Sequence, residues 1–184
     1  MKIKSLILGV LSSTILVSGL VNAATVTING GTVNFKGDFV NAGCAVSTDT
    51  ENQTVLLGQY RAADLKAVGQ TTTNIPLSIK LVGCNTAETQ SAQFSFNGVA
   101  DVVNNDLLSL TASNNNISTA TGVGIEILDR TGSALKPDGS SFSTVENLLE
   151  GTNTIHFNAR YKATAAAVTA GKADSSATFV IKYQ

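Results

Sequence analysis

"ATFVIKYQ", residues 177–184, closes the chain with a regular alternation of side-chain types. Ala177, Phe179, Ile181 and Tyr183 share one parity, and this period of two is typical of a β-strand with one buried face. Order is normally weakest at a chain end, so a strand that runs to the last residue must be held in place. We therefore expect the function to depend on how this final strand is held.

The rest of the chain predicts an all-β sandwich. Short runs rich in Val, Ile, Phe and Thr are separated by clusters of Gly, Asn, Asp and Ser, as in sandwiches of many short strands. One short helix is expected at 61–68, and turns are expected at 129–132 and 137–139, where Asp and Gly supply turn conformations. The expected strands are 32–39, 53–58, 75–82, 93–98, 107–111, 122–128, 154–161 and 177–183.

The start of the chain predicts export. Lys2 and Lys4 precede an apolar run at 5–17, and small residues at 21–23 suit a signal peptidase, so residues 1–23 are predicted to be a signal peptide. No later apolar run approaches the roughly 18 residues that a membrane-spanning helix needs. The remaining chain of about 160 residues is sufficient for one domain with its own core. A soluble, exported protein is expected.

Charge restricts the classes of partner, and the cysteine content predicts a disulfide. The net charge is −1 and only 14% of residues are charged, so neither nucleic acid nor an anionic membrane is expected as a partner. The two cysteines, Cys44 and Cys84, would most simply form one disulfide in an oxidising compartment. Such a bond would stabilise the fold by roughly 4 kcal/mol in the chain-entropy model.

The sequence offers no set of catalytic, cofactor-binding or metal-binding residues. His156 is the single histidine and falls in an alternating stretch, where a polar strand position is the simpler interpretation. The aspartates that could act as an acid and base pair lie in polar, turn-like stretches, namely Asp101, Asp106, Asp129 and Asp138. We therefore expect neither an enzyme nor a small-molecule substrate, cofactor or metal.

A second alternating stretch precedes the first cysteine. Gly31, Val33 and Phe35 share one parity with Gly37 and Phe39, and polar residues occupy the other. This stretch is either the first strand of the chain's own sandwich or an extension that pairs with another chain. Glycines on the apolar face favour the extension, since they allow close approach of another backbone. Val26 and Ile28 have the opposite parity and would need a shift of register at the glycine pair.

Several stretches of the mature chain resemble the pilins of the chaperone-usher pathway, and among these the major subunit of type 1 fimbriae. The likeness includes the family's C-terminal signature: a penultimate tyrosine, Tyr183, a glycine fourteen residues from the end, Gly171, and alternating apolar residues between them. The stretches that carry the likeness are NGGTVNFKGDFVNAGCAV (29–46), TVLLGQYRAADL (54–65), GVGIEILDRTGSAL (122–135), GTNTIHFNARYKAT (151–164) and ATFVIKYQ (177–184).

The resemblance implies an immunoglobulin-like sandwich that lacks its seventh strand. In such a protein the final strand borders a groove, which a periplasmic chaperone fills first and the N-terminal extension of the next subunit fills later, at the outer-membrane usher. This is the strand-addition mode of recognition. It implies a donor strand with Gly31, Val33 and Phe35, an acceptor edge with Gly171, Phe179, Ile181 and Tyr183, and the family disulfide between Cys44 and Cys84.

The resemblance also implies the domain plan and the partners. A signal peptide (1–23) is followed by a donor-strand extension (24–38) and a pilin domain (39–184). The protein would pass through the periplasm to the cell surface and polymerise with copies of itself into a rod that supports adhesion to host surfaces, with adaptor and adhesin subunits at the tip. An adhesin needs an additional lectin domain, for which the chain has no room. A minor adaptor or terminating pilin remains the alternative.

Overall fold

The computed structural model describes residues 25–111 and 118–184, so the predicted signal peptide lies outside the described residues. The chain divides into two compact units at Asp38 and Phe39. In the first unit, residues 25–38 form neither helix nor strand. The second unit, Phe39–Gln184, contains all the regular elements that follow.

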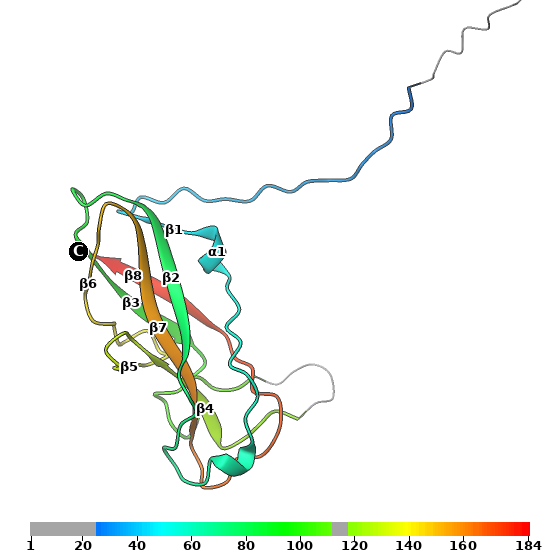
Figure 1. Ribbon diagram of the computed structural model, residues 1–184, viewed down its shortest axis with the longest axis vertical. Coiled ribbons are helices and arrows are strands. Elements are labelled where there is room, and N and C mark those ends of the chain that lie inside the picture. Colours follow the sequence, from blue (N-terminus) through cyan, green and yellow to red (C-terminus); the bar gives the residue numbers. More distant parts are fainter. Residues whose placement is uncertain (1–24, 112–117) are drawn as a thin grey trace, which may run out of the picture. The chain divides into compact units, whose positions relative to one another are not determined.

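The second unit is built from two antiparallel sheets (Figure 1). The larger sheet has the order β1-β2-β7-β4-β5, formed by Ala45–Val46, Ile75–Cys84, Gly151–Ala163, Val123–Leu128 and Ala134–Leu135. The smaller sheet has the order β6-β3-β8, formed by Glu146–Asn147, Ser91–Gly98 and Ala177–Tyr183. Two sheets, each with one apolar face, bury those faces against each other, and this gives the predicted sandwich.

The core lies where the alternating side chains of both sheets meet. Phe94 and Phe96 of β3 pack edge to face against Phe157 of β7, with ring centroids 5.5 and 5.3 Å apart. Ile79 and Leu81 of β2 are fully buried in the same cluster. The period of two in each strand therefore places one set of side chains in the core and leaves the other set on the outer faces.

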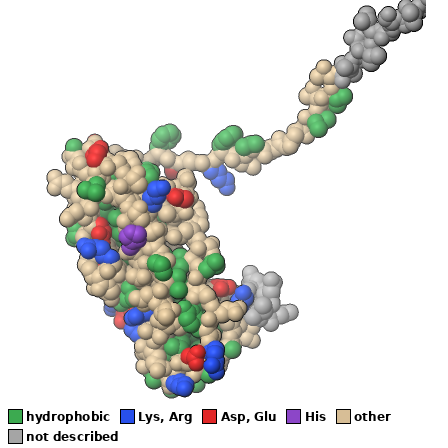
Figure 2. Space-filling view, in the orientation of Figure 1, with side chains coloured by type: hydrophobic (Ala, Val, Ile, Leu, Met, Phe, Trp, Pro, Cys, Tyr) green, Lys and Arg blue, Asp and Glu red, His purple; other side chains and the backbone are tan. Residues whose placement is uncertain are grey.

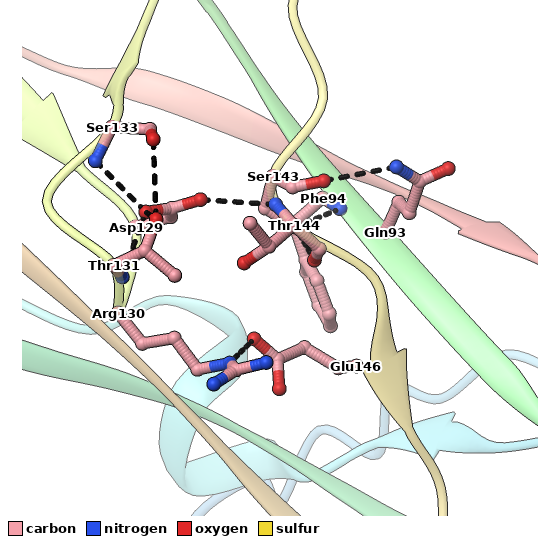
Figure 3. Close-up of polar contacts among 9 residues, drawn as sticks. All are labelled: Gln93, Phe94, Asp129, Arg130, Thr131, Ser133, Ser143, Thr144 and Glu146. Carbon is pink, nitrogen blue, oxygen red and sulfur yellow. Dashed lines mark hydrogen bonds and ion pairs between the residues drawn. The ribbon is translucent and has the colours of Figure 1, made fainter.

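A buried carboxylate joins the two sheets at the turn after β4 (Figure 3). Asp129 accepts hydrogen bonds from the backbone nitrogens of Thr131, Ser133 and Thr144, at 2.9 to 3.0 Å. The neighbouring Ser143 accepts a bond from the Phe94 nitrogen at 3.0 Å. Burial tends to raise the pKa of Asp129, but a hydrogen bond from the Thr131 hydroxyl at 2.7 Å and the bonds from these backbone nitrogens outweigh it and hold the pKa below its ordinary value.

The predicted disulfide is confirmed between Cys44 and Cys84. Cys44 immediately precedes β1, and Cys84 is the last residue of β2, the strand with which β1 pairs. The bond therefore fastens a two-residue edge strand that could not hold itself by its few ladder hydrogen bonds.

Most strand predictions are confirmed, but three are wrong. The predicted strands at 75–82, 93–98, 122–128, 154–161 and 177–183 correspond to β2, β3, β4, β7 and β8. No strand forms at 32–39 or at 53–58, because neither segment has a backbone partner among the described residues. At 107–111 only isolated bridges form, at Leu108 and Thr111.

The helix prediction is also wrong in extent. A single 3-10 turn, η1 (Ala62–Asp64), stands where a helix over 61–68 was expected. The Gln70 side chain accepts hydrogen bonds from the nitrogens of Lys66 and Ala67, at 2.5 and 3.0 Å, and closes a turn there instead. A short α1 (Thr48–Glu51), which was not predicted, follows β1. Within the two described ranges, no helix is long and apolar enough to cross a bilayer.

Candidate functional site

The final strand β8 lies at the edge of the smaller sheet. It pairs along its whole length with β3, and on its other side no strand is present in the described part of the chain. Gln184 and Ser91 exchange both backbone hydrogen bonds, at 2.9 and 3.0 Å. In an antiparallel ladder such bonded pairs alternate with unbonded ones, so the backbone groups of Phe179, Ile181 and Tyr183 point to the open edge.

The same three residues have partly exposed apolar side chains. Phe179, Ile181 and Tyr183 are only half-buried, although they pack against the core. Five further partly buried apolar side chains border this core: Val46, Leu57, Leu77, Leu110 and Tyr161. β8 therefore presents both unpaired backbone groups and incompletely covered apolar side chains along one edge. An edge of this kind is a template on which another strand can pair.

Tyr183 connects the end of β8 to the other sheet. Its hydroxyl donates a hydrogen bond to the Cys44 carbonyl at 3.2 Å, next to the disulfide. Burial raises the pKa of Tyr183, so the hydroxyl keeps its proton and acts as a donor at neutral pH. The open edge of β8 and the short edge strand β1 are thus held close together at this end.

The segment at 53–60 lacks backbone hydrogen bonds to any described neighbour. Side chains hold it instead: the Gln53 amide donates to the Ser78 carbonyl at 3.0 Å, and the Tyr60 ring packs against Tyr161 at 5.9 Å. Val55 and Leu57 are half-buried, while Leu56 between them is 82% exposed. The strand pattern is present, but its partner is missing.

Gly171 lies in the segment that precedes β8 and is not part of the strand edge itself. A Cβ added there would overlap the backbone of Ser118, Thr119 and Ala120, so the glycine permits a close approach of two chain segments. Gly171 also lines a cavity of about 510 Å³ together with Tyr60, Leu65, Val123, Tyr161 and Val168. This cavity lies close to the beginning of β8, since it also includes Asp174.

The predicted donor residues lie in the first unit and are exposed. Val33 is 74% exposed and Phe35 is 91% exposed. Val26 and Ile28 are each 80% exposed. Gly31 has φ +126°, a conformation that side-chain-bearing residues rarely adopt. Figure 2 shows apolar side chains uncovered along this segment. Large apolar side chains are therefore exposed along this segment.

The residues considered for catalysis have structural or surface positions. His156 is exposed on the outer face of the larger sheet, in register with Ser78. Asp101 and Asp138 accept hydrogen bonds from backbone nitrogens two residues ahead, at 3.0 and 2.9 Å, as turn aspartates do. These positions agree with their interpretation as strand and turn residues.

Comparison with known proteins identifies the family. A profile described as fimbrial protein matches residues 33–184. The chain belongs to the fimbrial protein family. It is 53% identical over 159 residues to the fimbrial subunit type 1 of Salmonella typhimurium, covering 86% of this chain and 85% of that protein. It is 48% identical over 185 residues to the type-1 fimbrial protein, A chain, of Escherichia coli K12, with all of both chains covered.

Two solved structures of pilus subunits share the fold. One comes from a chaperone-usher pilus whose structure concerns rod uncoiling; the match has a TM-score of 0.71 at 28% identity and covers 88% of this chain and 100% of that chain. The other is the P pilus rod subunit PapA, with a TM-score of 0.65 at 27% identity, covering 78% and 100% of the two chains.

These comparisons confirm the immunoglobulin-like fold and the structural role. The protein is a structural subunit of a bacterial fimbria and is exported to the cell surface, where it polymerises with other subunits. The family is a structural one. Rod subunits among the relatives favour a structural rod subunit over a minor adaptor or terminating pilin.

Sequence reasoning missed part of the site. Leu77, Leu110 and Tyr161 border the incompletely covered core, yet they lie in or beside ordinary strands and carry no distinctive local pattern. The alternation at 53–58 was a usable signal, because it indicated a strand for which the described fold supplies no neighbour.

Proposed function

We propose that the subunit polymerises by donor-strand exchange, with residues 24–38 as the donor and the open edge of β8 in the domain 39–184 as the acceptor. Gly31, Val33 and Phe35 enter the acceptor of the neighbouring subunit. Phe179, Ile181 and Tyr183 form the acceptor edge, and Gly171 shapes the chain that leads into it.

The open edge of β8 carries this proposal. A strand placed beside it would bond to the backbone groups of Phe179, Ile181 and Tyr183, the same residues whose side chains are half-covered. Burial of Val33 and Phe35 would contribute about 1.5 to 3 kcal/mol each, because both are exposed in the single chain. Completing the sheet and covering the core thus occur in one step.

Before assembly, the open edge needs a temporary cover. An apolar edge with unpaired backbone groups is an aggregation hazard. A periplasmic chaperone that lends a strand would remove this hazard, and an outer-membrane usher would be the place where the next subunit's donor replaces it. Adaptor and adhesin subunits at the tip would be joined by the same exchange. The similarity to a subunit of a chaperone-usher pilus supports these partners.

A deletion of residues 24–36 tests the donor role independently of the acceptor role. The deleted subunit, co-expressed with the chaperone, should still be captured by tagged chaperone, because β8 and its edge are intact. It should not join a rod, because it cannot fill the preceding subunit's groove. The measurements are a chaperone pull-down and a count of fimbriae by electron microscopy. Loss of chaperone capture, or rods of normal length, would contradict the assignment.

Gly31→Leu and Thr32→Leu form a matched pair for the same test. At Gly31 the new side chain would point into the groove, where overpacking costs about 1 to 3 kcal/mol. At Thr32 the same side chain would point to the outer surface, where substitutions usually change stability by about 0.5 kcal/mol or less. Rods should shorten with Gly31→Leu and keep their length with Thr32→Leu, while chaperone capture stays constant in both.

A further inference from the structure

We propose that the Asn29–Gly30 bond is a site of spontaneous chemical modification, at which Asn29 of unassembled subunits loses its side-chain amide. Asparagine is among the thermally labile residue types. Asn29 and Gly30 lie in the unit that forms neither helix nor strand, and both are exposed.

The local geometry favours attack on the Asn29 side chain. The Asn29 Oδ1 atom accepts a hydrogen bond from the Gly31 nitrogen at 3.2 Å, so the carboxamide is turned back over the backbone that follows it. A Cβ added at Gly30 would have no atom within 4 Å, so the surroundings of this glycine are open. Among the described residues the Gly30 nitrogen has no acceptor. Glycine also gives the backbone its widest freedom, so the chain can adopt the conformation that ring closure requires.

The chemistry needs only water. The Gly30 backbone nitrogen attacks the Asn29 carboxamide carbon, a C–N bond forms, and ammonia leaves with the proton from that nitrogen. This closes a five-membered succinimide ring. Water then opens the ring at either carbonyl, giving aspartate or isoaspartate. The net change replaces an amide by a carboxylate and releases ammonia, a covalent modification that adds a negative charge.

A second Asn–Gly pair in the same chain serves as an internal control. Asn97–Gly98 lies at the end of β3, where Asn97 pairs with Thr178 of β8. The Gly98 nitrogen donates to the Pro137 carbonyl at 2.7 Å, so it is not free to attack. A Cβ added at Gly98 would overlap the Leu108 side chain and the Ser176 carbonyl, so this glycine is closely packed. The two pairs share the reacting Asn–Gly bond and differ in their structural surroundings.

The consequence for assembly rests on the proposed donor role of residues 24–38. Conversion places a carboxylate two residues before Gly31, and in its isoaspartate form it adds a methylene group to the backbone. Both changes oppose insertion of the segment as a regular strand. Conversely, a donor segment paired in a rod is held extended by ladder hydrogen bonds, and ring closure then requires local opening. Unassembled subunits therefore lose the Asn29 amide with time, whereas assembled subunits are protected from this reaction.

The test compares two natural forms of the protein. Unassembled mature subunit is taken from the periplasm of cells that lack the usher, with its chaperone if bound, and intact fimbriae are sheared from normal cells. Both are incubated at mildly alkaline pH, digested, and analysed by mass spectrometry for conversion at Asn29 and Asn97. Asn29 should convert in the unassembled subunit, with little conversion at Asn97 or in fimbriae. Asn29→Gln should abolish the product, and Gly30→Val should slow it.

Each alternative outcome is decisive. Absence of conversion at Asn29 in the unassembled subunit would overturn the inference and leave donor-strand exchange untouched. Equal conversion at Asn29 and Asn97 would show that local structure does not control the reaction, which also overturns it. Equal conversion in unassembled subunit and fimbriae would show that Asn29 is unpaired in the rod. That result would overturn the proposed protection of assembled subunits, and it would leave the pairing of Gly31, Val33 and Phe35 untouched.

Discussion

The parity of the donor segment can be tested within a single chain. A fusion that appends residues 24–38 after Gln184 through a flexible linker should fill the chain's own open edge and give a stable monomer. Replacing both Val33 and Phe35 by serine in the appended copy removes the side chains assigned to the groove. Replacing Thr32 and Asn34 by alanine in that copy alters the opposite face and serves as the matched control.

The expected loss follows from exposure. Val33 and Phe35 are 74% and 91% exposed in the single chain, so nearly all of their burial depends on insertion. At about 1.5 to 3 kcal/mol for each side chain, the double serine variant should lose about 3 to 6 kcal/mol of unfolding free energy. For a domain of this size, at about 2 to 4 °C per kcal/mol, that corresponds to a fall in Tm of about 6 to 24 °C. The control pair, at about 0.5 kcal/mol or less for each substitution, should change Tm by about 4 °C or less.

Thermal unfolding of the purified fusions, followed by circular dichroism, measures these shifts. Val33→Ala alone, with a loss of about 1 to 2 kcal/mol, keeps the comparison measurable if the double variant is too unstable to purify. The reasoning would be refuted if the Thr32 and Asn34 changes lowered Tm as much as the Val33 and Phe35 changes. It would also be refuted if no change in the appended copy had any effect.

Three further predictions concern the domain itself and are measured by urea unfolding of the fusion with the unaltered appended copy. Replacing Cys44 and Cys84 by serine should lower the unfolding free energy by roughly 4 kcal/mol, and a loss below about 1 kcal/mol would mean that the bond contributes little. Tyr183→Phe should cost about 1 kcal/mol through the lost hydrogen bond to Cys44, and Tyr183→Ser should cost more; equal losses would assign the whole effect to the hydroxyl. Acid should destabilise the fold through Asp129 and Glu126: burial opposes ionisation of both, yet the hydrogen bonds to Asp129 and the Lys162 and Arg160 partners of Glu126 lower both pKa values. The stability that these two carboxylates provide is therefore complete above their ordinary pKa values of 3.8 and 4.5, and it is lost as the pH falls through the lower folded values. Glu126→Gln should therefore make the unfolding free energy fall less steeply with acid. An unchanged slope would exclude Glu126 as a contributor.

The parts of the fold that were predictable from sequence are those whose partners lie within the chain. β8 was predicted at its observed bounds, since the alternation of Phe179, Ile181 and Tyr183 is matched by the alternation of β3 beside it. β2 and β7 were predicted for the same reason and pair with each other. Local pattern and tertiary pairing agree in these strands, so the local signal was sufficient.

The failures occur where local pattern and pairing disagree. Residues 32–39 and 53–58 alternate as strands do, but no strand of the described chain lies beside them. Sequence reasoning detects which face of a segment is apolar, and it cannot detect whether a neighbour exists. The helix prediction at 61–68 failed for a different reason. The Gln70 side chain accepts hydrogen bonds from backbone nitrogens and so competes with helix formation, and such side-chain to backbone bonds leave no periodic signal in the sequence.

The open edge of β8 also restricts the register of any strand that completes it. Residues of an added strand that face Phe179, Ile181 and Tyr183 must direct their side chains into the core, because neighbouring residues in a sheet share a face. Gly31, Val33 and Phe35 supply three positions with the required spacing of two residues. A slip by one residue would turn Thr32, Asn34 and Lys36 inward, and burial of an unpaired lysine charge is prohibitive. The polar face of the proposed donor segment therefore specifies the register as strongly as its apolar face does.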